Sequence, residues 1–312
     1  MIRLGLCCLF QEEPVKFRAI TAKALSSSRR ADQLVRLSEV ALHNTESLLL
    51  ALQTLRRLGI GAFRIMSPFF PRYTHPEVGY TVDDLPDATT ILAALKKVSA
   101  FRRAHDIRLS FHPDQFVVLN SKREEVINKS IAEIEYQAVL AKMVGAEVIN
   151  IHVGGAYGDK TEAIKRFATT FSRLSTDARK RLTLENDDTL FTPADILPLC
   201  RDLRIPLVYD VHHHRCNPDD LSIEAATEHA FETWAHRKQE PHFHLSSPKN
   251  GWDSRAPKPH ADYIDASDVP KAWLGIDPLT IDVEAKAKEK AVLKLKAEWP
   301  ATSRESSRPR RR

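Results

Sequence analysis

The stretch EVINIHVGGAYGDKTEAIKRFATTFSRLSTDARKRLTLEN, residues 147–186, contains one complete unit of the expected fold. Two short runs that contain apolar and β-branched residues, 147–152 and 181–186, enclose a segment at 159–174 with the spacing of an amphipathic helix. Two parallel strands need a crossover between them, and that crossover is usually a helix. The stretch therefore predicts a βαβ unit.

The same alternation recurs along the whole chain. Strand candidates occupy residues 2–9, 62–67, 107–112, 147–152, 181–186, 206–211, 241–246 and 279–283. Helical patterns occupy residues 33–58, 88–104, 124–144, 159–174, 193–203, 222–238 and 285–297. Eight such units predict an α/β protein with a single (β/α)₈ TIM barrel. We expect one domain over 1–298, with one unusually long loop at 247–279.

Composition limits the class of protein. Of 312 residues, 43% are hydrophobic, which is enough for one large core. No run approaches the roughly 18 apolar residues of a membrane span, and the start lacks the layout of a secretory signal. The four cysteines form no CxxC pair, so we expect reduced structural thiols in a cytoplasmic protein.

The net charge of +5 is concentrated at one end of the chain. The segment ATSRESSRPRRR, residues 301–312, carries five arginines and one glutamate, so the remainder is nearly neutral. A basic segment with little apolar content cannot bury a core, and we therefore expect a disordered tail over 299–312. Such a tail could raise non-specific affinity for a polyanion or could simply be solvated.

Ionisable residues gather where the predicted strands end, and active sites of these barrels lie at that end. The residues are His75, His112, His152, Glu185, Asp210, His213, His242, His244, His260 and Glu284. Imidazoles and carboxylates without thiolates suit Zn²⁺ or Mn²⁺. Their number exceeds what one tetrahedral ion can use. We therefore predict a cluster of several metals, which suits hydrolysis of a phosphodiester.

Seven motifs together carry a family resemblance. They are HPDQFVVLNS (112–121), NIHVGGAYGDK (150–160), LENDD (184–188), YDVHHH (209–214), HLSSPKNG (244–251), HADYI (260–264) and EAKAKE (284–289). In order and spacing the chain resembles the UV damage endonuclease family, whose fold relative is endonuclease IV.

The resemblance implies a DNA repair enzyme acting on damaged double-stranded DNA. It implies incision of the backbone immediately 5′ to UV photoproducts (pyrimidine dimers and 6-4 photoproducts), leaving a 3′-hydroxyl. It also implies up to three divalent ions, with Mn²⁺ expected first and Zn²⁺ or Mg²⁺ as alternatives. We expect a monomer in a bacterial cytoplasm, associated with the nucleoid.

The resemblance also implies a role for each candidate residue. Glu185 would bridge two metals, as a catalytic residue. The first metal would take His112 and His152; the second Asp210, His244 and Glu284; the third His213 and His260. His75 would lie beside the scissile phosphate, as a ligand or a phosphate contact. Gln115 and Phe116 would probe the duplex opposite the lesion.

Three positions depart from the family pattern. Phe116 replaces a tyrosine, and Leu6 stands where many members have an aromatic residue. His242 replaces a lysine that can be carboxylated near the third metal, so we expect a weaker or different third site, with His242 still able to ligate. Within the run 212–214, neighbouring side chains of an extended chain point apart. We therefore expect only His213 to ligate and His212 and His214 to give support or contact DNA.

Three other functions stay open. The same barrel could hold an apurinic-site endonuclease or a sugar isomerase or epimerase, because those enzymes also use Glu, Asp and His at strand ends. A non-catalytic damage-binding protein would need structural metals, which usually have thiolate ligands.

Overall fold

Eight parallel strands form the centre of the molecule, and the computed structural model describes residues 2–299. The strands pair in the order β6-β5-β4-β3-β2-β1-β8-β7. They are β1 (Ile2–Cys7), β2 (Ala62–Ile65), β3 (Arg108–Phe111), β4 (Val148–His152), β5 (Leu182–Glu185), β6 (Leu207–Val208), β7 (His242–Leu245) and β8 (Leu279–Val283). Strands β6 and β7 stand at the two ends of this order. A single parallel bridge between Asp210, just after β6, and His244 of β7 joins them, so the sheet is a nearly closed barrel.

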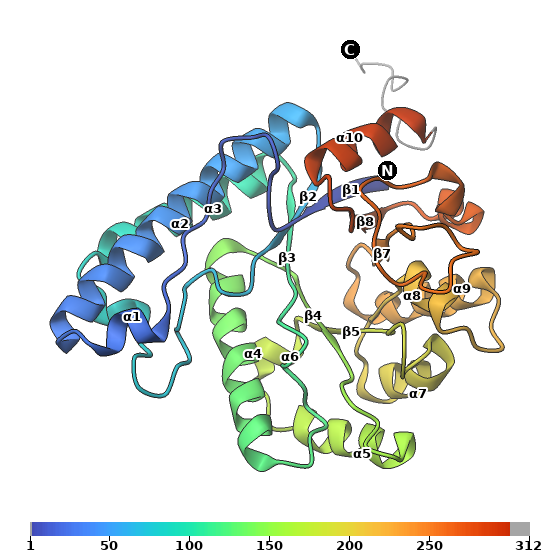
Figure 1. The fold of residues 1–312 in the computed structure, drawn as a ribbon, viewed down its shortest axis with the longest axis horizontal. Helices are drawn as coiled ribbons and strands as arrows, with labels where there is room; N and C mark the ends of the chain where they lie inside the picture. Colours follow the sequence, from blue (N-terminus) through green and yellow to red (C-terminus); the bar gives the residue numbers. More distant parts are fainter. Residues whose placement is uncertain (1, 300–312) are drawn as a thin grey trace.

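The longer helices lie outside the strands, as Figure 1 shows. They are α2 (Arg30–Leu58), α3 (Ala88–Ala104), α4 (Glu124–Val144), α5 (Lys160–Phe171), α7 (Pro193–Leu203), α9 (Ile223–Trp234) and α10 (Glu289–Glu298). Short helices complete the described part of the chain: α1 (Ala22–Ser26), α6 (Thr176–Arg179), α8 (Val211–Cys216), and the 3₁₀ turns η1 (Val82–Asp84), η2 (Ala235–Arg237), η3 (Ala266–Asp268) and η4 (Lys271–Gly275). The predicted (β/α)₈ barrel is confirmed.

Element ends differ from the prediction where side chains cap helices. The strand expected at 206–211 ends at Val208, because the Asp210 side chain accepts a hydrogen bond from the His213 backbone and starts α8. The helix expected from residue 285 begins at Glu289 instead, after Lys288, which has a positive φ of 52° and a ψ of −126°. Before β8 begins at Leu279, the segment from residue 247 contains two 3₁₀ turns and an isolated bridge between Pro248 and His260, which agrees with the predicted long loop.

The ends of the chain bear on the predicted domain boundary. The predicted tail begins at Trp299, whose side chain is buried just beyond the end of α10. Residues 300–312 of the predicted tail lie outside the described residues. No helix in the described part of the chain is long and apolar enough to cross a membrane.

The barrel interior contains polar side chains below the strand ends. Arg64 of β2 and Asp282 of β8 are both buried there. Gly5 of β1 faces the Asp282 carboxylate so closely that a Cβ at this position would collide with it. The glycine therefore makes room for a charged group inside the barrel, directly under the predicted site.

Candidate metal centre

Glu185 lies at the centre of the strand-end residues, at the last position of β5. Its Oε2 is 3.0 Å from His112 Nε2, and its Oε1 is 3.1 Å from His244 Nδ1 and 3.3 Å from His213 Nδ1. Burial alone would raise the pKa of this carboxyl, but the surrounding imidazoles hold that pKa well below its usual range. Glu185 is therefore an anion at neutral pH, with one oxygen facing each side of the cluster.

One side of the cluster comes from β3 and β4. His112 and His152 have ring centroids 5.4 Å apart, and His152 Nε2 lies 3.9 Å from Glu185 Oε2. With Glu185 they form a group that could hold one metal ion. Asn150, two residues before His152 on the same face of β4, donates a hydrogen bond to Glu185 Oε2.

The other side of the cluster comes from the start of α8. Asp210 Oδ1 accepts the hydrogen bond that caps the helix, 2.8 Å from the His213 nitrogen. Asp210 Oδ2 is buried without a hydrogen-bond partner among residues 2–299, and it lies 3.6 Å from His213 Nδ1. A buried, unpartnered carboxylate oxygen is costly unless a cation accompanies it. The donor set of Glu185, Asp210 and His213 therefore fits a divalent ion.

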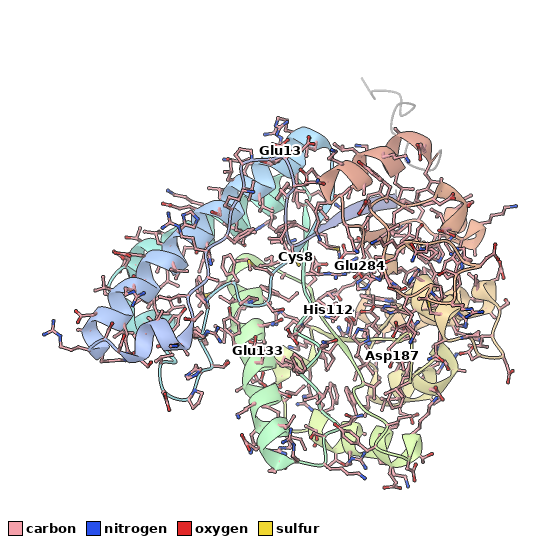
Figure 2. The ribbon with its side chains drawn as sticks, in the orientation of Figure 1. Cys8, Glu13, His112, Glu133, Asp187 and Glu284 are labelled. Atoms are coloured by element: carbon pink, nitrogen blue, oxygen red, sulfur yellow. The ribbon has the colours of Figure 1, made fainter. Side chains whose placement is uncertain are left out.

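His244 and Glu284 extend the cluster toward β7 and β8. His244 Nδ1 is 3.4 Å from Glu284 Oε1, and His260 Nδ1 is 3.7 Å from Glu284 Oε2. Arg64 Nη2 is 2.6 Å from Glu284 Oε1. Burial would raise the pKa of Glu284, but Arg64 and His244 lower it. Figure 2 labels His112 and Glu284, which lie near each other in the middle of the molecule.

The grouping differs in detail from the expected three sites. The structure brings His213 together with Asp210 and Glu185, whereas His260 lies beside Glu284 with its ring 6.4 Å from that of His213. Glu185 still contacts both sides of the cluster, as a bridging ligand would. The ligand roles of these residues stay predictions.

His242 lies inside the barrel, below the cluster. It is 2% exposed, and its Nε2 lies 3.1 Å from Asp282 Oδ2. The described residues that could hold an ion with it are His244 and Asp282, and neither His213 nor His260 belongs to that group. Arg64 Nε is 3.2 Å from the same Asp282 oxygen, so a cation already neutralises this carboxylate. We infer that His242 acts as a partner of Asp282, not as a third-site ligand.

Replacing His242 by alanine tests this inference. We expect the free energy of unfolding to fall by about 1–3 kcal/mol, because buried Asp282 loses its nearest imidazole and keeps Arg64 at 3.2 Å and His244 at 3.9 Å. The number of metal ions per chain should stay unchanged. Chemical denaturation and elemental analysis of the same preparation measure both quantities, and loss of one ion per chain would return His242 to the ligand set.

The other two histidines of the 212–214 run are structural. His212 is buried, with Nε2 3.1 Å from the Lys258 carbonyl oxygen. His214 is also buried, between the Tyr209 hydroxyl at 2.7 Å and Asp219 Oδ1 at 3.0 Å. Neither side chain faces the surface. Their burial argues against direct contact with DNA, and a supporting role for the candidate ligands stays a prediction.

A cavity of about 1450 Å³ opens at the same end of the barrel as the cluster. It is lined by the loops that follow β2 and β3 and by the start of α4, and His75, Gln115 and Phe116 are among its residues. Phe116 sits in a tight turn that the Asp114 side chain holds, and it is 77% exposed. No other large apolar side chain of residues 2–299 is as exposed. The predicted exposure of Phe116 is confirmed.

His75 lines this cavity and belongs to none of the groups of described residues that could hold an ion. Its Nδ1 accepts hydrogen bonds from the backbone nitrogens of Glu77 and Val78, at 3.2 and 3.3 Å. In the neutral ring the proton therefore sits on Nε2, which leaves a donor for a phosphate oxygen. Leu6, by contrast, is fully buried in β1 and cannot contact a ligand.

Tyr157 adds an aromatic side chain to the cavity wall. It follows β4, has φ 53°, and is 42% exposed. The Lys122 ammonium donates a hydrogen bond to the Tyr157 carbonyl and lies 5.9 Å from its ring centre. A positive φ at a non-glycine residue strains the backbone, and such strain persists where neighbouring groups hold the residue in place, as they do at many functional sites. A ring beside a fixed cation is a surface suited to a nucleic acid.

Two residues of the site were missed by the sequence analysis. Arg64 contacts Asp282, Glu284 and His244, and Asn150 holds Glu185. Asn150 lies two positions before His152, and Asp282 lies two positions before Glu284, so the alternation of strand side chains places each on the same face as a predicted ligand. That spacing was the available signal for Asn150, but Arg64 precedes no predicted ligand by two residues.

Comparison with known proteins agrees with this geometry. The family described as UV-endonuclease UvdE matches residues 2–306 of the chain. The chain belongs to the UV-endonuclease UvdE family. The UV DNA damage endonuclease of Bacillus cereus strain B4264 is 34% identical over 309 residues, which cover 95% of this chain and 93% of that protein.

Solved structures give the same result for this UvdE family member. The crystal structure of SacUVDE matches with a TM-score of 0.83 and 30% identity, over 95% of this chain and 96% of that one. Endonuclease IV from Thermus thermophilus matches with a TM-score of 0.61, over 95% and 98% of the two chains. D-psicose 3-epimerase from Clostridium cellulolyticum reaches 0.52, over 78% and 83%. At 16% and 13% identity these last two show the barrel fold alone.

Proposed function

We propose that this chain cuts the backbone of double-stranded DNA immediately 5′ to a UV photoproduct and leaves a 3′-hydroxyl. The observation that carries the proposal is the pairing of a carboxylate-histidine cluster with a large cavity at the same end of the barrel. Membership of the UV-endonuclease family supports DNA as the substrate.

The cluster is suited to hold two or three divalent ions, with Mn²⁺ as the proposed metal and Zn²⁺ or Mg²⁺ as alternatives. Bound ions would supply a nucleophile near neutral pH and neutralise charge on the phosphate. Glu185 would hold the spacing of the cluster with its two oxygens. Asn150 and Arg64 would keep the carboxylates Glu185 and Glu284 oriented for their ligand roles.

His75 and Lys122 are suited to position the DNA backbone. The free Nε2 donor of His75 would bind a phosphate oxygen beside the cluster, and the Lys122 ammonium at the cavity wall would neutralise another phosphate. Their contacts would place one phosphodiester bond next to Glu185 before cleavage.

Phe116 is suited to recognise the lesion. A crosslinked pyrimidine pair is already poorly stacked, so flipping it out of the duplex costs less than flipping normal bases. An exposed aromatic side chain on a tight turn can fill the gap and convert that difference into selectivity. Gln115, its neighbour, would contact the exposed bases of the opposite strand.

Replacing Phe116 by alanine tests this role. We expect the affinity for a damaged duplex to fall by about tenfold or more, because stacking on an aromatic side chain is lost. The single-turnover rate at saturating enzyme should change far less. Because Phe116 is 77% exposed, the melting temperature should not move.

Leu274 offers a matched control, since it is an exposed apolar side chain at 50% on η4. Leu274→Ala should leave affinity and rate unaltered. Equal selectivity for damaged over intact duplex in Phe116→Ala and in the wild-type protein would remove Phe116 from lesion recognition.

Chelation separates the proposed enzyme from a protein that only binds damage. After EDTA treatment, cutting of an irradiated duplex should stop while binding to it partly persists, and added Mn²⁺ should restore cutting. A duplex with one abasic site provides the second substrate. Cutting of the abasic duplex alone would assign the chain to apurinic-site repair.

A further inference from the structure

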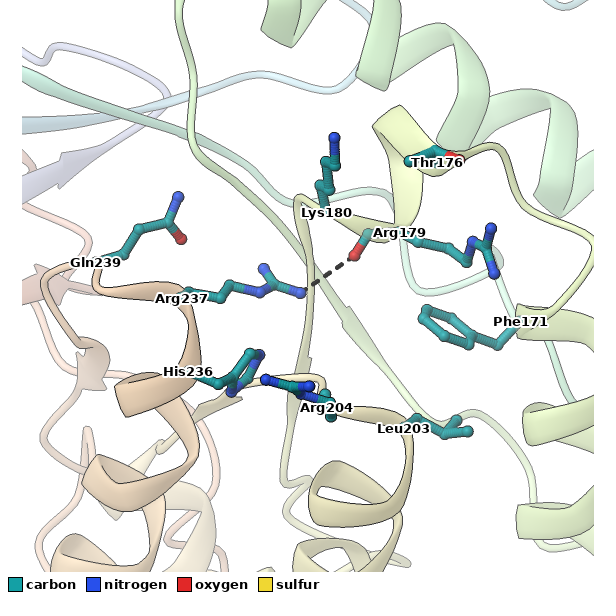
Figure 3. A pocket seen from close by; sticks show the side chains of 9 residues that line it. All are labelled: Phe171, Thr176, Arg179, Lys180, Leu203, Arg204, His236, Arg237 and Gln239. Carbon is teal, nitrogen blue, oxygen red and sulfur yellow. Dashed lines mark hydrogen bonds between the residues drawn. The ribbon is translucent and has the colours of Figure 1, made fainter.

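A second hollow, of about 480 Å³, lies at the opposite end of the barrel from the metal centre. It is formed where α6, α7 and η2 lead into β5, β6 and β7, as Figure 3 shows. Strand β5 connects the two ends: Leu182 begins the strand near this hollow, and Glu185 ends it in the metal centre. The hollow therefore belongs to a different face of the molecule from the catalytic cavity.

Four of the nine residues that line this hollow are positively charged. Arg179, Lys180, Arg204 and Arg237 line it together with His236, and no carboxylate is among the lining residues. Within residues 2–299, none of the four cations has an Asp or Glu oxygen within 4.0 Å. Nearby arginines differ, since Arg181 and Arg201 pair with Asp177 and Glu232. Four cations without a counter-ion around one concave surface attract an anion.

Arg237 lies across the hollow with its guanidinium partly unsatisfied. Nη2 donates hydrogen bonds to the carbonyl oxygens of Arg179, at 3.1 Å, and Leu182, at 2.8 Å, and Figure 3 marks the first of these. Nη1 is buried and has no hydrogen-bond partner among residues 2–299. Burial lowers the pKa of Arg237 to about 10. A charged group desolvated without a partner is costly, and a bound anion would remove that cost.

The same hollow holds one unpartnered acceptor. Gln239 Oε1 is buried without a hydrogen-bond partner in the described part of the chain. A carbonyl oxygen of this kind needs a donor, such as a hydroxyl or amino group, and a fully deprotonated anion offers none. The lining therefore matches a molecule that carries both a phosphate and a hydrogen-bond donor. A volume of about 480 Å³ falls within the usual range for small-molecule sites.

We propose that this basic hollow binds a small phosphorylated molecule of the nucleotide class, with the phosphate held by Lys180, Arg204 and Arg237 and a hydroxyl or amino donor on Gln239. A second segment of DNA fits less well, because the hollow is small and concave and faces away from the metal centre. The proposal is independent of the cutting reaction.

Binding of ADP and of pyrophosphate to the full chain tests the proposal by calorimetry. The chosen variant is Lys180→Gln/Arg204→Asn, because asparagine tolerates the left-handed conformation of Arg204 at φ 55°. Lys97→Gln, on the exposed surface of α3, is the matched control. We expect the double variant to bind both probes at least about tenfold more weakly than the wild type. The control should bind like the wild type.

Each other outcome overturns the proposal. If the double variant binds ADP and pyrophosphate as tightly as the wild type does, both probes bind at the metal centre. If the wild type binds neither probe at millimolar concentration, the hollow is not a site for this class of ligand. A double variant that loses affinity for duplex DNA but not for ADP identifies the hollow as a nucleic-acid contact. Cutting of damaged DNA by the double variant should match the wild type.

Discussion

Glu185→Gln should lower the single-turnover rate of DNA cutting by about three orders of magnitude or more, because the anion that we propose as a bridging ligand is replaced by a neutral amide. The carboxylate is 1% exposed and faces His112, His213 and His244. An amide of the same shape keeps the packing but cannot bring two cations together. Quenched-flow measurements on a duplex with one defined lesion give the rate, and elemental analysis gives the metal content.

The control for this substitution is Glu39→Gln on the exposed surface of α2. It removes the same charge far from the cluster, so rate and metal content should match the wild type. Circular dichroism should show the same fold for both variants. A Glu185→Gln variant that cuts at nearly the normal rate would rule out the bridging role.

Asp210 should show the second large effect, and two substitutions separate its two oxygens. Asp210→Asn keeps an oxygen for the cap of α8 but loses the charge that Oδ2 would offer to a metal. We expect this variant to keep its stability, and to lose about a hundredfold or more in metal affinity and activity. Asp210→Ala removes the cap as well, so it should also lower the free energy of unfolding by about 1 kcal/mol.

Metal titration followed by enzyme activity and chemical denaturation measures these effects. The comparison of the two variants is itself the control, because both lose the charge and only one loses the cap. If Asp210→Asn binds metal as tightly as the wild type, the buried Oδ2 is not a ligand. The lack of a hydrogen-bond partner for Asp210 Oδ2 among residues 2–299 would then have a cause other than metal binding.

The barrel was predictable because its signal is repeated along the chain. Eight β-branched runs separated by helical patterns admit few other arrangements, and the structure confirms all eight strands. Element ends were less predictable, because they depend on single side chains. Asp210 was expected at a strand end, but its carboxylate caps α8 and shortens β6.

The convergence of the candidate residues also followed from the sequence. His112, His152 and Glu185 end three adjacent parallel strands, so they had to meet at one end of the barrel. The residues that contact the site from inside the barrel could not be predicted from the sequence, because a residue such as Arg64 looks like any other residue of a strand. Its contacts with Asp282 and Glu284 come from opposite ends of the sequence and are visible only in three dimensions.

His242 illustrates the limit of transferring roles by position. The residue aligns with a lysine expected near a metal, and the period of two places it on the same face as His244. However, His242 comes two residues before His244 in β7. It therefore lies deeper in the barrel, with its Nε2 3.1 Å from Asp282 Oδ2. We therefore infer the role of His242 from its position along the strand, and the family-based ligand role stays an untested prediction.

The most direct test of the proposed function is incision of synthetic duplexes that each carry one defined lesion, with Mn²⁺, Zn²⁺ or Mg²⁺ added back singly to metal-free protein. Product ends are identified on sequencing gels. We expect cutting immediately 5′ to a pyrimidine dimer, with a 3′-hydroxyl, and Mn²⁺ as the most effective ion. No cutting of any lesion with any of the three ions would contradict the proposal.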